Sequence, residues 1–337
     1  MMKKKILALA LASAMALSLA ACGSSASSSS GSASGSSSAA GSASGEKYTI
    51  GICQLVQHPA LDAATKGFRD AVDEALPGQV SWDEQNAAGE SANCTTIVNG
   101  FVSEGVDLIM ANATAALQAA ANATSDIPVL GTSVTEYGVA LGIDNFSGTV
   151  GTNVSGTSDL APLDQQADMV KELFPDAKNV GILYCSAEPN SVYQANTVQS
   201  ALEALGYAVK IYTFADSNDV AAVTQTACDE SDVLYIPTDN TAANAAETIN
   251  NVAQPAGVPI VAGEEGICKG CGVATLSIDY YELGRTTGQM AVKILTGESK
   301  VEEMPIEYYP NPVKEYYPDR ASALGITIPD GYTAIEG

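Results

Sequence analysis

The stretch DLIMANATAA (residues 107–116) joins a short apolar run to a polar turn and the start of a helical pattern, and it recurs as DVLYIPTDNTAA (residues 232–243). Two further landmarks recur in the same order, namely IPVLG (127–131) with VPIVA (258–262) and Gly51-Ile52 with Gly181-Ile182. The offsets are 125, 131 and 130 residues. Chance similarity between two α/β domains is the alternative, because the matches are short and apolar. Three landmarks at nearly one spacing favour two lobes of one topology.

From Lys47 onward, short apolar runs alternate with longer stretches of helical period. This alternation predicts an α/β fold of two similar lobes with doubly wound parallel sheets. The expected strands cover residues 48–55, 106–110, 127–130 and 273–278, and the expected helices cover 59–76, a segment from 114, and 280–295, before an extended tail. We assign residues 47–158 plus 279–300 to the N-terminal lobe and 159–278 plus 301–337 to the C-terminal lobe. Several chain crossings between the lobes would form a hinge.

Residues 1–21 have the layout of a secretory signal, with a lysine-rich start, an apolar run and small residues before Cys22. The tetrapeptide LAAC (19–22) resembles the bacterial lipobox, in which cleavage leaves the cysteine as a lipid-modified N-terminus. An ordinary signal peptide with an incidental cysteine is the alternative. Residues 22–46 are almost wholly Ser, Gly and Ala, so we expect a flexible tether. The protein would then be extracytoplasmic and held on the membrane by lipid on Cys22, without spanning it.

Charge and residue inventory exclude several classes of function. The chain has 15 basic and 39 acidic residues and a net charge of −24, which disfavours binding to nucleic acid. Removal of residues 1–21 takes away three lysines and no acid, which leaves 12 basic against 39 acidic residues, or −27. His58 is the only histidine, so metal sites that need two are excluded. No phosphate-binding loop or Gly-x-Ser-x-Gly motif occurs, and we therefore predict a protein without catalytic residues, metal or cofactor.

The candidate site lies at the carboxyl ends of the predicted strands, where ligands of open parallel sheets meet the N-termini of helices. The loops there carry amides, hydroxyls and acids but no Arg or Lys. The predicted ligand-binding residues are Gln57, His58, Thr114, Thr132, Ser158, Asp159, Asn190, Ser191, Thr238, Asp239, Asn240 and Glu264. Asp159, Asp239 and Glu264 could bind an ammonium group, and helix amides at 114–116 or 240–242 could bind a carboxylate, so an amino acid fits. Helix capping is the structural alternative for several of these residues.

The cysteines provide one local motif, Cys-Lys-Gly-Cys at residues 268–271. A single C-x-x-C with no second pair and no histidine is half of a zinc site, and it stands in the wrong place for a thioredoxin-like motif. We predict free thiols or a small loop disulfide, with redox catalysis or metal binding as the alternatives. Cys53, Cys94, Cys185 and Cys228 lie in apolar periodic segments and are predicted to be core residues.

Several motifs together resemble a known family. They are GICQ (51–54), HPALD (58–62), ATAA (113–116), DIPV (126–129), GTSD (156–159), PTDNT (237–241) and YELGRTTG (281–288). From about residue 48 to 330 the chain resembles the tryptophan/tyrosine-type family of ABC transporter substrate-binding lipoproteins, and HPALD and PTDNT are the most specific pieces. Two stretches depart from the family pattern, ICKGCG (267–272) and YYPD (316–319), and both bear on the identity of the ligand.

The resemblance implies a type I periplasmic-binding-protein fold that closes on a small ligand and hands it to a membrane permease. Characterised relatives are associated with aromatic amino acids. The cleft of the family would correspond to Gln57, His58, Thr114, Asp159, Asn190, Asp239, Asn240 and Glu264.

The sequence therefore predicts the lipid-anchored solute-binding protein of an ABC importer. We expect a monomer that captures a small zwitterionic ligand, an aromatic or apolar amino acid, and delivers it to permease and ATPase subunits. Two alternatives stay open, a sensor subunit that a membrane receptor reads and a binder of another small solute such as a nucleoside or a sugar.

Overall fold

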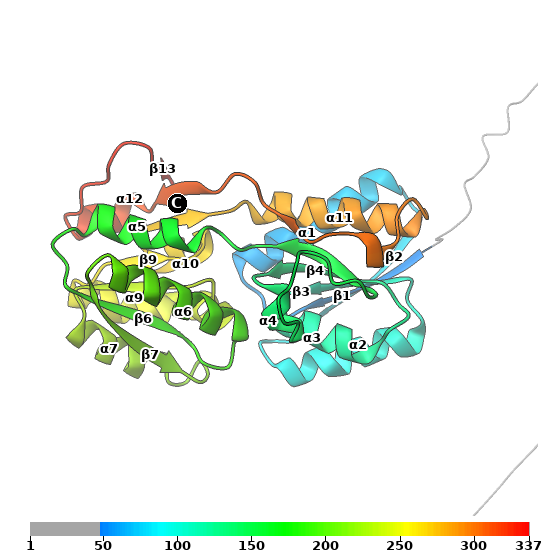
Figure 1. Cartoon of the computed structure of the whole chain (residues 1–337), viewed down its shortest axis with the longest axis horizontal. Helices are drawn as coiled ribbons and strands as arrows, with labels where there is room; N and C mark the ends of the chain where they lie inside the picture. Colours follow the sequence, from blue (N-terminus) through cyan, green and yellow to red (C-terminus); the bar gives the residue numbers. More distant parts are fainter. Residues whose placement is uncertain (1–47, 337) are drawn as a thin grey trace, which may run out of the picture. The chain divides into compact units, whose positions relative to one another are not determined.

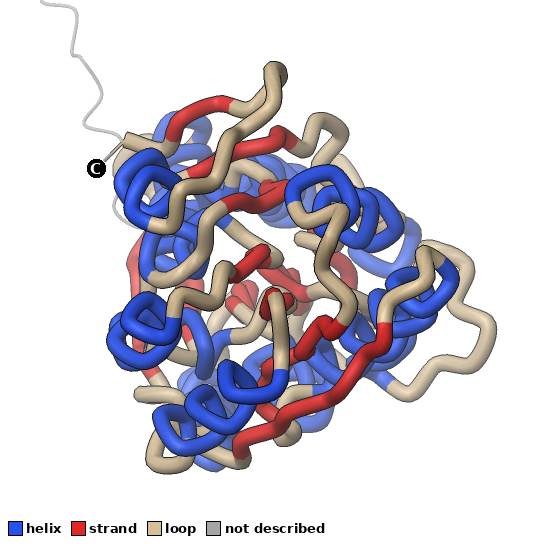
Figure 2. The backbone as a smooth tube through the Cα atoms, turned by 90° about the vertical axis from the view of Figure 1, so that its left-hand side faces the viewer, coloured by secondary structure: helices blue, strands red, loops and turns tan. Residues whose placement is uncertain are grey.

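The computed structural model of the chain describes residues 48–336 (Figure 1). The predicted signal peptide, Cys22 and the predicted tether lie outside these residues. No helix within residues 48–336 is both long and apolar enough to cross a bilayer. The described chain forms two mainly parallel sheets, which confirms the predicted α/β fold class. Figure 2 shows helices around most of the strands.

The first sheet has six strands in the order β11-β5-β4-β3-β1-β2, all paired in parallel. Its strands are β1 (Tyr48–Gln54), β2 (Val80–Asn86), β3 (Leu108–Asn112), β4 (Val129–Val134), β5 (Val154–Ser158) and β11 (Glu307–Tyr308). The elements packed with it are α1 (Pro59–Ala75), α2 (Ser91–Glu104), α3 (Thr114–Ala123), α4 (Tyr137–Leu141), α11 (Tyr280–Leu295) and the 3₁₀ helix η1 (Val301–Glu303). We call this body the first lobe.

The second sheet has seven strands in the order β13-β12-β10-β9-β8-β6-β7, and only β12 against β10 is antiparallel. Its strands are β6 (Asn179–Cys185), β7 (Ala208–Phe214), β8 (Val233–Ile236), β9 (Ile260–Ala262), β10 (Ala274–Ser277), β12 (Val313–Tyr316) and β13 (Thr333–Ala334). Its helices are α5 (Leu163–Leu173), α6 (Pro189–Ala204), α7 (Val220–Glu230), α8 (Asn240–Asn244), α9 (Ala246–Ala256), α10 (Glu265–Gly270) and α12 (Pro318–Ala323). We call this body the second lobe.

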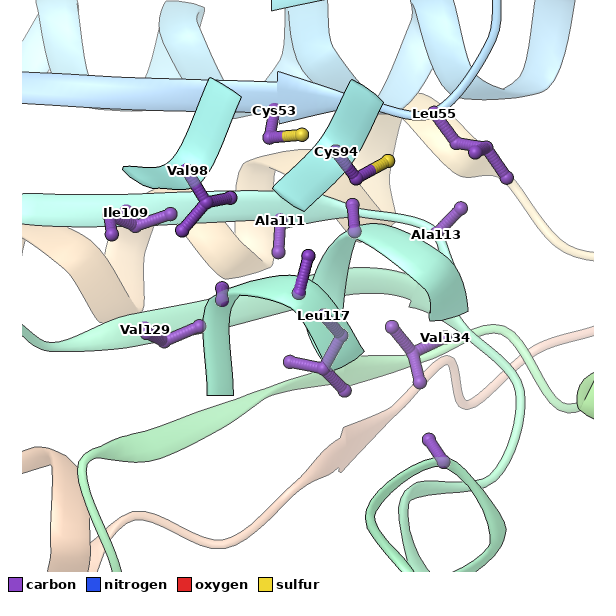
Figure 3. Packing of buried hydrophobic residues seen from close by; sticks show 14 of the residues in the cluster. Cys53, Leu55, Cys94, Val98, Ile109, Ala111, Ala113, Leu117, Val129 and Val134 are labelled. Carbon is purple, nitrogen blue, oxygen red and sulfur yellow. The ribbon is translucent and has the colours of Figure 1, made fainter. Parts of the chain in front are cut away.

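Each sheet buries both faces, as the near-continuous apolar strands predict. In the first lobe, α2 and α3 pack on one face around Cys53, Cys94 and Leu117, which Figure 3 shows from close by. On the other face, α1 and α11 enclose Phe68 and Met290. In the second lobe, α5 and α6 cover one face and α7 and α9 the other. The two cores leave the carboxyl ends of the strands free to build a site.

Helices α1 and α11 touch through glycines, although more than 200 residues separate them in sequence. A Cβ atom on Gly284 would lie 2.0 Å from the carbonyl oxygen of Ala64, and a Cβ atom on Gly67 would lie 2.0 Å from the carbonyl oxygen of Tyr281. No side chain can occupy those positions without moving the backbone of the opposite helix. The contact fixes the start of α11 beside the start of α1.

Two strands begin later than the sequence pattern predicts, β3 at Leu108 instead of 106 and β4 at Val129 instead of 127. The Thr124 hydroxyl accepts the amide N–H of Ile127, and Pro128 has no amide N–H, so the turn extends to residue 128. The tail after residue 296 is not uniformly extended, because Pro318 begins α12 at a position where proline is favoured.

The lobe assignment of residues 301–308 was wrong in detail. The sequence prediction placed 301–337 in the second lobe, whereas Val301 is buried in the core of the first lobe and β11 pairs with β5. A two-residue strand has no periodic pattern, so its backbone pairing alone decides its place. The chain therefore crosses between the lobes in three places, at residues 159–162, 278–279 and 309–312.

Candidate ligand-binding site

The carboxyl ends of both sheets contribute to one cleft, and a hydrogen bond joins the lobes across it. Nε2 of His58, at the start of α1, lies 3.3 Å from Oδ1 of Asn240, at the start of α8. Beside this bond is a small inner cavity of about 10 Å³. Its lining consists of His58, Leu61, Ser133, Thr135, Asp159, Asn190, Thr238, Asp239, Asn240, Ala243, Glu264 and Tyr280. That volume is close to what one water molecule or one ammonium group needs.

An outer pocket of about 380 Å³ adjoins the inner cavity and shares Asn190 and Asn240 with it. The outer pocket is lined by Leu55, Val56, residues 88–92, Ala115, Gln118, Cys185, residues 187–190, residues 215–217, Asn240, Thr241 and Asn244. Its walls combine apolar side chains from both lobes with the acids Glu90, Glu188 and Asp216. Neither cavity has an Arg or a Lys among its described lining residues.

The sequence prediction and the structure overlap on the inner cavity. Seven predicted residues line it, namely His58, Asp159, Asn190, Thr238, Asp239, Asn240 and Glu264. Sequence reasoning missed Tyr280 and Thr135. Tyr280 lies three residues after the end of β10, so the rule that selected the other loops would have found it if applied to that strand as well. The loops after β2 and β7, which line the outer pocket, were missed for the same reason.

The other predicted residues line neither cavity. Gln57 is exposed and borders a separate groove of about 500 Å³ beside α1 and β2. The hydroxyl of Thr132 lies 3.2 Å from that of Thr157, and Ser158 donates to the carbonyl oxygen of Thr135. Ser191 accepts a hydrogen bond from its neighbour Asn190, and Thr114 is buried at the start of α3. These four buried residues support the loops that carry the cavity.

Three buried polar atoms of the inner cavity have no hydrogen-bond partner among the described residues. They are Nδ1 of His58, Oγ of Ser133 and Oδ1 of Asp159. The amide nitrogen of Asn240 donates to Glu188 at 2.7 Å, so its Oδ1 must accept from Nε2–H of His58. Burial lowers the pKa of His58, which favours the neutral ring and makes Nδ1 an acceptor. The cavity therefore presents two acceptors and a hydroxyl to any ligand group.

The acids of the second lobe are engaged at helix N-termini. The Asp239 carboxylate accepts the amide N–H groups of Ala242 and Cys185, both at 2.7 Å. The Glu264 carboxylate accepts the amides of residues 266 and 267 at the start of α10. Glu188 accepts the amides of residues 240 and 241 at 3.0 and 2.9 Å. The capping alternative is thus what the structure shows for Asp239 and Glu264, and the amides of residues 240–242 are already occupied by protein carboxylates.

Asp159 differs from those acids, because it starts the first crossing between the lobes and caps no helix. Its Oδ2 accepts the hydroxyl of Tyr280 at 3.0 Å, while Oδ1 faces the inner cavity. Burial raises the pKa of Asp159 to about 6, although the neighbouring hydroxyls of Thr135 and Tyr280 act to lower it. Burial likewise raises the pKa of Glu264 to about 7, and burial together with the Glu188 charge raises that of Asp239 to about 8. No Lys or Arg among the described lining residues of the cavity lowers the pKa of these carboxylates.

The first lobe offers the opposite polarity. No described side chain caps α1 or α3, but α1 carries Asp62 in its first turn, whereas α3 has no acid there, so the first amide groups of α3 have no protein anion beside them. The backbone around the cleft is also strained, since Ala88, Ala113 and Ser133 have φ of 55°, 90° and 53°, which non-glycine residues rarely adopt. Strain of this kind concentrates at functional sites. The start of α3 therefore suits an anionic group, and the inner cavity suits a cationic group.

Metal and thiol chemistry find little support in the described part of the chain. Among residues 48–336 no group of three or more His, Cys, Asp or Glu side chains could hold a metal ion. All six described cysteines are free and buried, so of the predicted free thiols or loop disulfide at Cys268 and Cys271 the structure has the free thiols. Cys268 lies on α10, and burial raises its pKa well above the usual value. The guanidinium of Arg320 donates to the carbonyls of residues 268, 269, 270 and 272 and so caps the C-terminus of α10.

Two α/β lobes joined by three crossings, with polar loops facing one cleft, define a two-lobed solute-binding protein. More particularly, residues 49–334 match the model of the ABC transporter substrate binding protein family, and the chain belongs to that family. This confirms the predicted family, which is one of solute-binding proteins and not of enzymes.

Individual relatives agree with this assignment. The "Tyrosine-binding protein" of Clostridioides difficile (strain R20291) is 36% identical over 266 residues, which cover 78% of this chain and 76% of that protein. A domain from Streptococcus pneumonia solved in complex with L-Trp has a TM-score of 0.81 at 31% identity, over 87% of this chain and 100% of that one. A ligand-free, open substrate binding protein with adhesive properties from Clostridium difficile has a TM-score of 0.66 at 36% identity, over 86% and 99%. The backbone is thus more similar to the complex than to the open form.

Proposed function

We propose that the protein captures an aromatic or apolar α-amino acid between its lobes and delivers it to the permease of an ABC importer. The observation that carries the amino-acid part is the inner cavity, where buried, unpartnered acceptors and several carboxylates lie together and no described lining residue is a Lys or an Arg. The relatives named above, one called tyrosine-binding and one solved with L-Trp, support the ligand class.

The ammonium group of the ligand would enter the inner cavity. A primary ammonium has three N–H donors, and Oδ1 of Asp159, Nδ1 of His58 and Oγ of Ser133 provide three positions that can accept them. Asp159 contributes the full charge, because its Oδ1 is the free carboxylate oxygen there. A charge-assisted bond of this kind contributes about 1.5–3 kcal/mol.

The carboxylate of the ligand would lie against the first lobe. Binding of the ligand carboxylate at the amides of residues 240–242 is disfavoured, because Glu188 and Asp239 already accept hydrogen bonds from those amides. Helix α3 has ten residues, an uncapped start and Ala115 in the wall of the outer pocket. Its N-terminal amides and dipole favour an anion, typically by about 0.3–1 kcal/mol and more in buried geometry. This arrangement places the ammonium toward Asp159 and the carboxylate toward α3.

The side chain of the ligand would occupy the outer pocket. Its volume of about 380 Å³ fits the range of small-molecule sites, and Leu55, Val56, Ala115 and Pro189 provide apolar surface. The acids at its rim disfavour a negatively charged side chain. An aromatic or large apolar side chain suits this combination.

Location and delivery complete the proposal. The LAAC sequence at 19–22 supports lipid attachment at Cys22, and the Ser-, Gly- and Ala-rich stretch to residue 46 would tether the lobes at the outer face of the cell membrane. The family supports ABC permease and ATPase subunits as partners. We propose that a single copy of the chain docks on the permease once the lobes enclose the ligand.

Calorimetric titration of ligand-stripped protein tests the ligand class. L-tyrosine, L-tryptophan and L-leucine are compared with 3-(4-hydroxyphenyl)propionate, which lacks the ammonium group, and with a nucleoside and a sugar as controls. We expect at least one amino acid to bind with micromolar or tighter affinity, and the deaminated analogue to bind at least tenfold more weakly. Binding of the nucleoside or the sugar alone would refute the amino-acid assignment.

A further inference from the structure

Asp159 lies where the proposed ligand-binding site meets the chain crossings between the lobes. It is the first residue after β5, in the crossing at 159–162, and Tyr280 is the first residue of α11, directly after the crossing at 278–279. Their 3.0 Å hydrogen bond therefore links two of the three connections between the lobes. Both residues are buried, with exposed fractions of 4% for Asp159 and 6% for Tyr280, and both line the inner cavity.

The two oxygens of Asp159 have separate roles. Oδ2 accepts from Tyr280, while Oδ1 is buried without a partner among the described residues and faces the cavity. We propose that Asp159 and Tyr280 form a proton-sensitive latch, in which the ammonium group of the ligand replaces a proton on Asp159 and the ionised carboxylate then holds Tyr280 and the two crossings together. This inference rests on the proposed function and adds regulation to the same site.

The proton balance of the step is simple. In the empty cavity the carboxyl of Asp159 holds a proton around pH 6 and below, because burial raises its pKa to about 6. An ammonium group at Oδ1 stabilises the ionised form, so the proton leaves to solvent and no other covalent bond changes. An ionised acceptor roughly doubles the strength of the hydrogen bond from Tyr280. Ligand capture and the tightening of the crossings are thereby coupled.

Other ionisable groups face Asp159 from the elements packed around it. They are Tyr280 of α11, Tyr137 of α4, Glu264 before α10, Asp239 before α8 and His58 before α1. Beyond burial, the Asp159 charge raises the pKa of Glu264, and the buried His58, whose pKa is lowered, does not offset it. The ligand ammonium is therefore the only cation that the proposed complex would bring to the described residues of this cavity.

The affinity for ligand should consequently depend on pH. Below the pKa of Asp159, affinity should fall by up to tenfold for each pH unit, and above it the dependence that Asp159 contributes should level off. Neither group of a free α-amino acid titrates between pH 5 and 8, so the ligand itself adds no dependence. Titration at pH 5.5 in two buffers of different ionisation enthalpy should show release of a fraction of a proton for each L-tyrosine or L-tryptophan bound.

Two matched tyrosine variants test the latch. Tyr280→Phe keeps the ring and removes the donor to Asp159, so the carboxyl ionises less readily and the pH midpoint of binding should move upward by about half a unit or more. Tyr281→Phe is the control, because Tyr281 is the next residue of α11 and also donates to a carboxylate, Asp70 at 2.8 Å, outside the cavity. Tyr281→Phe should leave the midpoint unchanged.

The outcomes separate this inference from the proposed function. A Tyr280→Phe protein that binds more weakly by the same factor at every pH, with an unshifted midpoint, would reduce Tyr280 to a structural residue and overturn the latch. So would wild-type affinity that is constant from pH 5 to 8. Absence of amino-acid binding at any pH would instead refute the proposed function itself. A parallel titration with Asp159→Asn, which has no proton to lose, should abolish the step in affinity near pH 6.

Discussion

Replacing Asp159 by asparagine should change stability and binding in opposite directions. Asparagine keeps the shape and can still accept the hydroxyl of Tyr280, but it removes a buried carboxylate whose Oδ1 has no partner among the described residues. A shift of the pKa from 3.8 to about 6 corresponds to roughly 3 kcal/mol of unfavourable ionisation. The free energy of unfolding of the ligand-free variant should therefore exceed that of the wild type by up to about 3 kcal/mol at pH 8 and by almost nothing at pH 4.

The sign follows from proton linkage. The folded state binds the Asp159 proton more tightly than the unfolded state does, so the wild type loses stability as the pH rises from about 4 through 6. Loss of the charge-assisted bond to the ligand should weaken binding by about 1.5–3 kcal/mol, or roughly 10- to 150-fold. A residue whose removal stabilises the empty protein and weakens ligand binding is one retained for function.

Urea unfolding at pH 4 and pH 8, combined with calorimetric titration of L-tyrosine and L-tryptophan at pH 8, measures both effects. Asp70→Asn is the matched control, because Asp70 also accepts a tyrosine hydroxyl but lies at the surface beside Lys66. The control should show neither the gain in stability nor the loss of affinity. Destabilisation of the ligand-free Asp159→Asn protein at pH 8, or wild-type affinity in that variant, would refute the reasoning.

Three further predictions concern the scaffold. Gly284→Ala should lower the free energy of unfolding in urea by about 3 kcal/mol or more, because its Cβ would clash with the backbone of α1. Gly100→Ala, in open space on α2, should raise that free energy by up to about 1 kcal/mol. Equal effects of the two substitutions would contradict the packing of α1 on α11. Because the pKa values of Asp239 and Glu264 are raised to about 8 and 7, the melting temperature of the ligand-free protein should fall as the pH rises from 6 to 9, and a rise would be contrary evidence. Arg320→Gln removes hydrogen bonds to the last carbonyls of α10 and should lower stability by about 2–4 kcal/mol; an unchanged unfolding midpoint would show that this cap is dispensable.

Much of the cleft could be predicted because strand periodicity carries spatial information. The carboxyl ends of parallel strands share one edge of a sheet, so His58, Asn190 and Asp239, each shortly after a predicted strand, could be grouped from the sequence. Asp159 joined them as part of the predicted connection between the lobes. The repeat of the two lobes then placed both edges at one cleft. Fold and cleft are thus largely encoded in short apolar runs and the polar residues that follow them.

The roles of individual acids could not be predicted, because a helix N-cap and an ammonium ligand require the same residue type. Asp239 and Glu264 use their oxygens on backbone amides, while Asp159 keeps one oxygen free, and only the geometry distinguishes them. Tyr280 was missed because the loop after the strand predicted at residues 273–278 was not included among the candidate loops. The short strand β11 has no sequence period, which explains the misplaced boundary.

A crystal structure of the protein with L-tyrosine or L-tryptophan bound would test the central claim most directly. The proposed arrangement predicts the ligand nitrogen within about 3.2 Å of Oδ1 of Asp159, the carboxylate at the amides that begin α3, and the side chain in the outer pocket. A ligand carboxylate facing Asp159, or a ligand bound outside the cleft between the lobes, would contradict it.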